Sequence, residues 1–304
     1  MEVIPIAPRG FCKGVFNAIR LAKKTALENP QVKITVLGQL VHNRYVSEAL
    51  KLLNIDTLDE PHASRIELLS KIKDGIVIFT AHGVSSSIRE EALRRNLKIV
   101  DATCDDVWNT HALIKSAQNE GQTLFYIGKA GHPETQGIMD SFSEIYLIER
   151  TEDVPDIGKH HKIFVTNQTT MSKNDIEHII HAIIKQYPQA HIANEICAAT
   201  RLRQQAVERI PDADALIVVG DPRSNNTQML VKIATQHGIA NVHRIESIEQ
   251  LDTALLKKNM RIAVTSGAST PAKLTRQVID YLNDYDFDHP APLPRVDITT
   301  LLDE

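Results

Sequence analysis

Three cysteines are the residues of this chain best suited to chemistry: Cys12, Cys104 and Cys197. They are 92 and 93 residues apart, and no short paired spacing such as C-x₂-C occurs. A buried, inert thiol is the ordinary interpretation of any single cysteine. Three thiolates together can instead hold an iron–sulfur cluster, or a zinc ion with one histidine. The near-equal spacing therefore raises the question of whether the chain repeats itself.

The surroundings of the cysteines do repeat. Each one follows a short apolar segment that is typical of a strand and precedes an amphipathic helical pattern. Inert core cysteines need not recur at one topological position, so the repeat favours a shared metal centre. The three segments read EVIPIAPRGFC, LKIVDATC and AHIANEIC.

Two further apolar segments follow in each third of the chain, and each ends in a polar loop. Strands alternating with helices predict a parallel sheet in every third. We expect an α/β fold built from three pseudo-equivalent domains with mostly parallel sheets. The predicted boundaries are 14–103, 104–196, and 197–284 completed by residues 1–13; the proline-containing segment 285–304 is predicted to be an extended C-terminal arm laid across another unit.

The polar loops lie at the carboxyl ends of predicted strands, where parallel sheets collect their ligands. Histidines, hydroxyls and amides beside helix N-termini are typical of an anion or phosphate site. Capping the next helix is the alternative for any one Ser or Thr, and Ser172 and Ser269 are good candidates for it. Glu134 is the one carboxylate of the set, and in a partly desolvated pocket it could carry a proton. The loop residues are His42, His82, His132, Glu134, Thr169, Thr170, Ser224, Asn225, Asn226 and Ser269.

Composition excludes several classes of function. The 304 residues are 42% hydrophobic with a formal net charge of −4, and no basic block suggests nucleic-acid binding. No apolar run has membrane-spanning length, and the first residues do not resemble a signal peptide. An odd number of widely spaced cysteines argues against disulfides, so we expect a reducing, cytoplasmic environment. The dinucleotide, P-loop and nucleophile-elbow motifs do not occur.

The three thiols leave two kinds of centre open. A fully ligated [4Fe–4S] cluster takes four cysteines, so three would leave one iron with an open coordination position. A zinc ion would need a histidine as its fourth ligand.

A set of motifs, in order along the chain, resembles the 4-hydroxy-3-methylbut-2-enyl diphosphate reductase family. The resemblance runs from residue 5 to about residue 285. It implies a trefoil of three α/β domains around a central iron–sulfur cluster. It also implies a reductive dehydroxylation in the methylerythritol phosphate route to isoprenoids, with reduced ferredoxin or flavodoxin as electron donor. The motifs are PRGFCKGV, VHN, TAHGVS, DATC, GHPETQG, QTTMS, ICAAT, SNNT and SGAST.

The resemblance also implies roles for individual residues. Cys12, Cys104 and Cys197 would hold a [4Fe–4S] cluster with one open iron, and Glu134 would be the proton source. Thr169 would hydrogen-bond near the substrate hydroxyl and Glu134, and His132 would contact the diphosphate or assist proton delivery. The expected diphosphate ligands are His42, His82, Ser224, Asn225, Asn226 and Ser269.

The sequence departs from the usual family pattern at four positions. Asp105 and Asp106 follow a predicted cluster ligand, Asn225 stands where many members have Ser, and Lys13 stands where Ala is common. Two other functions would use the same residues: a non-catalytic, cluster-based redox sensor, or a zinc hydrolase with Cys and His ligands.

Overall fold

The computed structural model describes residues 1–158 and 161–303, so three residues of the predicted domains and arm lie outside the description. Contacts group the chain into two compact units. Unit 1 contains Met1–Phe16, Val41–Leu53 and the chain from Ala198 onward, and unit 2 contains Asn17–Leu40 and Asn54–Cys197.

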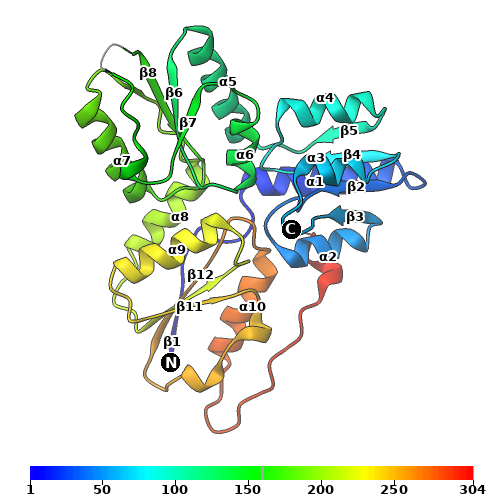
Figure 1. Ribbon diagram of the computed structural model, residues 1–304. Coiled ribbons are helices and arrows are strands. Elements are labelled where there is room, and N and C mark those ends of the chain that lie inside the picture. The colour runs from blue at the N-terminus through cyan, green and yellow to red at the C-terminus, as the bar shows by residue number, and fades with distance from the viewer. Residues whose placement is uncertain (159–160, 304) are drawn as a thin grey trace. The chain divides into compact units, whose positions relative to one another are not determined.

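Within the described residues, the strands form three parallel sheets of four strands each, and Figure 1 shows their strands side by side. This confirms the predicted α/β class with parallel sheets. Unit 2 holds the first two sheets. The first has the order β3 (Ile55–Leu58), β2 (Ile34–Leu37), β4 (Ile76–Phe79), β5 (Lys98–Asp101), and the second has β7 (Ile145–Ile148), β6 (Thr123–Ile127), β8 (Ile163–Asn167), β9 (His191–Ile192). Unit 1 holds the third: β11 (Asn241–Ile245), β10 (Ala215–Val219), β12 (Arg261–Ser266), β1 (Glu2–Pro5).

The three sheets share one topology. In each sheet the chain passes from one central strand to the edge strand beside it. It then crosses to the other central strand, whose outer neighbour is the second edge strand. The order therefore reverses between β2 and β4, between β6 and β8, and between β10 and β12, which is where ligands bind to open parallel sheets. In the third sheet the fourth strand is β1, from the start of the chain. Each cysteine thus follows the fourth strand of a sheet.

The helices connect the strands and cover the sheets (Figure 1). Side chains of α7 pack on one face of the second sheet, and side chains of α5 and α6 pack on the other. The third sheet is covered by α10 on one face and by α8 and α9 on the other. Helices α3 and α4 pack on the first sheet. The helices are α1 (Lys13–Glu28), α2 (Arg44–Lys51), α3 (Arg65–Ser70), α4 (Ser86–Arg94), α5 (Asp105–Asn119), α6 (Pro133–Met139), α7 (Lys173–Gln186), α8 (Ala198–Glu208), α9 (Asn225–Gln236) and α10 (Ala272–Asn283).

Coverage on both faces explains the strand sequences. All residues of ITVL in β2, IVIF in β4 and ALIVV in β10 are buried. A strand of a one-sided sheet would alternate apolar and polar residues, whereas these runs are almost continuously apolar.

Two glycines at strand ends leave room for a threonine of the next helix. A Cβ on Gly128 would lie 2.8 Å from Oγ1 of Thr135, and one on Gly220 would lie 2.5 Å from Oγ1 of Thr227. Each threonine is seven residues further along the chain. The repeated Gly thus lets the helix N-terminus approach the end of its strand closely.

The C-terminal segment is extended and ends in a short 3₁₀ helix, η4 (Ile298–Thr300). Leu301 and Leu302 are buried, and Leu301 joins the apolar core that α10 forms on the third sheet. Lys273 Nζ of α10 donates to the carbonyl of Thr300. In the described part of the chain, no helix is long and apolar enough to cross a membrane.

Candidate active site

The three cysteines are held in the same way. Each backbone N–H donates to the carbonyl of the residue two positions beyond the end of a central strand. All three side chains are half-buried and form no disulfide. The pairs are Cys12 with Ala268 (3.0 Å), Cys104 with Ala81 (3.0 Å) and Cys197 with Thr169 (3.1 Å).

Each cysteine also stands at the start of a helix. Cys12 precedes α1, Cys104 is the N-cap of α5, and Cys197 precedes α8. The backbone N–H of Val15 points at Sγ of Cys12 at 3.5 Å. Helix N-termini stabilise anionic groups, so the surroundings suit thiolate ligands, the donor set of iron–sulfur clusters. Within residues 1–158 and 161–303, no group of three or more His, Cys, Asp and Glu side chains could hold a single metal ion.

Glu134 and Thr169 meet at the carboxyl end of the second sheet, where the strand order reverses. Glu134 is the second residue of α6 and only 1% exposed. Its Oε1 accepts the backbone N–H of Thr169 at 2.8 Å, and its Oε2 accepts the Thr169 hydroxyl at 2.9 Å. The predicted closeness of these two residues is confirmed.

Burial decides the protonation of Glu134. Loss of hydration raises its pKa to about 7, although the Thr169 N–H, the Thr169 hydroxyl and the Tyr126 hydroxyl all lower it. The nearby Asp106 raises it slightly. A pKa raised to about 7 lets Glu134 carry a proton near neutral pH, as a general acid requires.

His132 is a neutral hydrogen-bond donor beside Glu134. Burial lowers the pKa of His132 well below its usual value, and His82 and Lys129 lower it further. Its Nδ1 accepts the backbone N–H of Glu134 at 3.2 Å, so the ring proton must be on Nε2. The rings of His82 and His132 meet edge to face with 5.2 Å between centroids. These two predicted residues lie together in unit 2.

A second set of predicted residues lies in unit 1. The Ser269 hydroxyl donates to the carbonyl of His42 at 2.8 Å, which joins the loop after β12 to the loop before α2. Asp221 adds a second link there. Its buried carboxylate accepts the backbone N–H groups of Arg44 at 3.1 Å and Arg223 at 2.8 Å. Ser269 is not an N-cap, because α10 begins later with Pro271 at the cap position.

The SNNT loop supplies a helix cap and also hydrogen bonds to other parts of unit 1. Ser224 is the N-cap of α9 and accepts the N–H of Thr227 at 3.3 Å, while Asn225 is buried in the first turn. The Asn226 amide bonds within the protein: its Oδ1 accepts the Ala268 N–H at 3.0 Å, and its Nδ2 donates to Thr200 Oγ1 at 3.1 Å. The predicted cap at Ser172 is confirmed, since it accepts the N–H of Asp175.

Glu134 and Asn226 occupy equivalent positions in the repeat. Each lies six residues beyond a strand-end glycine, Gly128 or Gly220. Each accepts the backbone N–H of the residue whose carbonyl holds a cysteine. One topological position thus carries an acid in the second sheet and an amide in the third, and only the acid can carry a proton.

Several residues of these networks were not predicted, among them Gln168, Asp221 and Tyr126. Gln168 is buried, and its Oε1 accepts the Lys129 N–H and the Thr135 hydroxyl. Asp221 follows a strand-end glycine, which is a weak signal in the sequence. Tyr126 occupies an ordinary core position of a strand, and nothing in the sequence distinguishes it.

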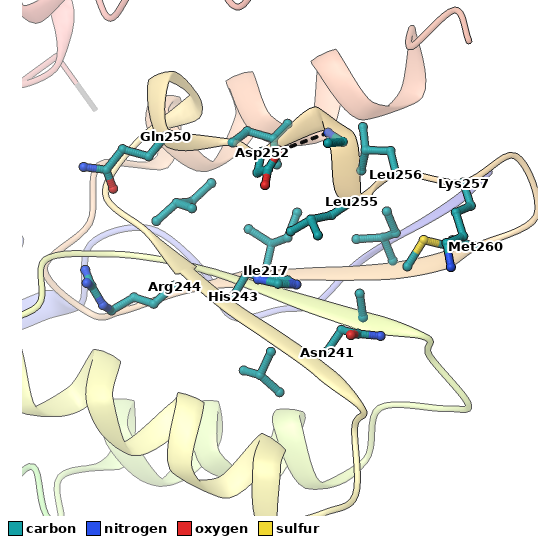
Figure 2. A pocket seen from close by; sticks show the side chains of 16 residues that line it. Ile217, Asn241, His243, Arg244, Gln250, Asp252, Leu255, Leu256, Lys257 and Met260 are labelled. Atoms are coloured by element: carbon teal, nitrogen blue, oxygen red, sulfur yellow. Dashed lines mark hydrogen bonds between the residues drawn. The ribbon is translucent and has the colours of Figure 1, made fainter.

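A cavity elsewhere in unit 1 contains none of the predicted site residues. Figure 2 shows it between β11 and the short helices η2 (Ile248–Gln250) and η3 (Thr253–Leu255). Its volume is about 470 Å³, and aliphatic side chains such as Ile217 and Leu255 line much of it.

Known proteins resemble the chain over nearly its whole length. The chain is 46% identical to the 4-hydroxy-3-methylbut-2-enyl diphosphate reductase of Symbiobacterium thermophilum, over 94% of this chain and 98% of that one. It is 44% identical to the reductase of the same name from Brevibacillus brevis, over 96% and 94%. The solved structure of the E-1-hydroxy-2-methyl-but-2-enyl-4-diphosphate reductase from Plasmodium falciparum matches with a TM-score of 0.87 and 28% identity, over 99% of this chain and 96% of that one.

A second solved structure, of (E)-4-hydroxy-3-methyl-but-2-enyl diphosphate reductase, matches with a TM-score of 0.66 and 28% identity, over 93% of this chain and 100% of that one. The family model described as LytB protein matches residues 3–283, a range that includes every cysteine, histidine and loop residue discussed above. With three like sheets, three cysteines held alike and a buried acid at a strand-order reversal, the chain belongs to the LytB protein family.

Proposed function

We propose that this protein reduces (E)-4-hydroxy-3-methylbut-2-enyl diphosphate to isopentenyl diphosphate and dimethylallyl diphosphate. The reaction breaks the C–O bond of the substrate hydroxyl, consumes two electrons and two protons, and releases water. The observation that carries the proposal is the buried Glu134–Thr169 pair, with the pKa of Glu134 raised to about 7. The names of the relatives in the LytB family support the choice of substrate.

The hydrogen bonds of Glu134 support the assignment of the acid proton to one of its two oxygens. Oε1 accepts the Thr169 N–H, which can only donate, so the acid proton belongs on Oε2. There it faces the Thr169 hydroxyl at 2.9 Å, and that hydroxyl can accept it while donating its own hydrogen onward. Glu134 and Thr169 are therefore proposed to deliver the proton that lets the hydroxyl leave as water.

The diphosphate is proposed to bind polar groups of the strand-end loops. His132 offers its Nε2–H as a neutral donor, and His82 lies beside it. In unit 1 the candidates are His42, Ser224, Asn225, Asn226 and Ser269. The Nδ2 group of Asn226 has a second hydrogen besides the one given to Thr200, so it can still donate to a phosphate oxygen.

Cys12, Cys104 and Cys197 are proposed to hold a [4Fe–4S] cluster with one open iron. The repeated backbone hydrogen bond and the helix start at each thiol support this assignment. When bound, such a cluster supplies the electrons and a Lewis-acidic iron. Reduced ferredoxin or flavodoxin as the donor, and a cytoplasmic location, remain predictions.

The test is anaerobic purification, quantitation of iron, acid-labile sulfide and zinc, and a reductant-coupled assay with the allylic diphosphate. Iron and sulfide together with both products are expected. A cluster without any turnover would contradict the proposal and favour the redox sensor. Zinc without sulfide would contradict it in favour of the hydrolase.

Reductase activity is expected to fall at alkaline pH. Glu134 must be protonated to deliver its proton, and its pKa is raised to about 7. The value of kcat should therefore be constant below about pH 6 and fall about tenfold per pH unit well above pH 7. Measuring kcat between pH 5.5 and 9 at saturating substrate checks this. A kcat that rises through pH 7 would contradict the role of Glu134 as an acid.

Changing His42 to Ala is expected to weaken substrate binding with the iron content unchanged. Loss of one hydrogen bond to a charged group costs about 1.5–3 kcal/mol, so KM should rise about 10- to 100-fold. His237→Ala, at the C-cap of α9, is the matched control and should keep KM. An unchanged affinity of His42→Ala for a diphosphate ligand would remove His42 from the site.

A further inference from the structure

The hydroxyl of Tyr126 lies behind the proposed acid. Tyr126 is on β6 and is 0% exposed, and its ring packs in the core with Ile114 and Ile138. Its Oη donates to Glu134 Oε1 at 3.5 Å. Because packing fixes the ring, the hydroxyl can only turn about its own C–O bond, so it stays close to Glu134.

This hydroxyl has a second polar neighbour. Besides its hydrogen bond to Glu134, it interacts with the side chain of Thr135. The Thr135 hydroxyl gives its hydrogen to Gln168 Oε1 at 3.2 Å, so its oxygen can accept from Tyr126. Tyr126 can therefore donate to Glu134 when that side chain is charged, and to Thr135 when it is neutral. Both states leave the buried hydroxyl satisfied.

Tyr126 contacts the oxygen of Glu134 that does not carry the proton. The acid proton belongs on Oε2, toward Thr169, whereas Tyr126 faces Oε1. Tyr126 therefore does not compete for the proton. It acts on the negative charge that remains once the proton has left, and that charge is costly in a fully buried carboxylate.

The other groups around Glu134 do not replace this donor. Asp106 of α5 is negative and raises the pKa of Glu134, and burial keeps the neighbouring His132 neutral. Among the residues that the structure describes, the two other hydrogen bonds to the Glu134 carboxyl group come from Thr169, which is proposed to pass on the proton. Tyr126 is thus a donor that stabilises the carboxylate from outside the proton path.

We propose that Tyr126 is a positioning residue for proton delivery, holding Oε1 of Glu134 and stabilising the carboxylate left after the proton has gone. This inference rests on the proposed function, in which Glu134 is the proton source. It predicts that removing the hydroxyl makes Glu134 a weaker acid, with two opposite consequences for the rate.

Tyr126→Phe is the first variant, tested in the cluster-loaded enzyme. A weaker acid transfers its proton more slowly, so kcat on the low-pH plateau should fall about three- to tenfold. Glu134 also stays protonated to higher pH, so the alkaline fall of kcat should move up by about 0.5–1 pH unit. KM and iron content should not change. A kcat profile superimposable on that of the unmodified protein would overturn the proposal.

Tyr187→Phe is the matched control. Tyr187 is also buried beside the second sheet, and its hydroxyl donates to the carbonyl of Pro155 at 2.5 Å. The change should lower stability and leave the pH profile in place. If it moved the alkaline limb as much as Tyr126→Phe did, the effect would be general to the sheet and the proposal would be wrong.

A measurement without substrate separates this inference from the proposed function. Infrared difference spectra of the oxidised protein should show one buried carboxylic acid titrating near pH 7, which Glu134→Gln abolishes. Its midpoint should rise in Tyr126→Phe. A 3-fluorotyrosine placed at position 126 keeps the ring and is a stronger donor, so there the midpoint should fall. Unmoved midpoints would overturn the role of Tyr126 even in an active reductase, whereas shifted midpoints in a protein without reductase activity would refute only the proposed function.

Discussion

Glu134→Gln is expected to lower kcat by about 10²–10⁴-fold, the usual contribution of a positioned general acid. The amide has the shape of the carboxyl group: its oxygen can accept the Thr169 N–H and its NH₂ can donate to the Thr169 hydroxyl. The site should therefore stay intact and lose only the proton. Steady-state assays at several pH values check this, and the alkaline limb of kcat should vanish with the titrating group.

Two further measurements make the Glu134 result specific. Iron and sulfide content should equal those of the unmodified protein, because no cluster ligand changes. Glu120→Gln, at the exposed C-cap of α5, is the control and should keep kcat within about twofold. A rate for Glu134→Gln within threefold of the unmodified protein would rule out the proton role.

The second large effect is expected at the cysteines. Cys104→Ser should lose most of its iron and sulfide and lower activity by more than about a hundredfold. Removing a residue that only orients a metal ligand lowers metal affinity or activity about 10- to 100-fold. Here the ligand itself is lost. The serine hydroxyl is a poor replacement because a soft thiolate is what iron–sulfur clusters require. Metal analysis and the coupled assay on the same anaerobic sample measure both losses.

The fold should survive the Cys104 change. The side chain is half-buried, the backbone bond to Ala81 does not involve the sulfur, and Ser is a preferred N-cap for α5. Circular dichroism and the melting temperature should therefore stay close to those of the unmodified protein depleted of its cluster. Asp105→Asn, at the next residue, keeps the thiol and should keep the cluster. Full cluster content in Cys104→Ser would refute the ligand assignment.

Local sequence patterns were sufficient for the fold class. Strands buried on both faces must be almost continuously apolar, and parallel strands need helical connections. Runs such as ITVL and ALIVV, followed by glycine and then a helical pattern, leave few alternatives. Glycine recurs at the ends of two strands, as Gly128 and Gly220, because Thr135 and Thr227 occupy the space that a Cβ would need there. The boundaries of the three predicted domains stay predictions, while contacts group the chain into two units.

The candidate site was predictable where residue type alone indicates chemistry. Cys, His and Glu in polar loops at strand ends are conspicuous in a sequence, because such side chains are seldom needed for packing. The family resemblance implied that Thr169 lies near Glu134, and the two side chains are hydrogen-bonded. The structure also places the rings of His82 and His132 in contact. Ser269 was wrongly expected to be a possible helix cap, since a hydroxyl near a helix start does not reveal that α10 begins at Ala272.

By itself the sequence determined three parallel α/β sheets, the repeated place of the cysteines and one acid among the loop residues. The tertiary structure alone decided that Asn226 bonds Ala268 and Thr200 and that Asp221 holds the start of α2. It alone brought Tyr126 behind Glu134. The physical reason is that residue type and spacing fix which elements form, whereas the partners of a buried side chain depend on its direction and on elements distant in the chain.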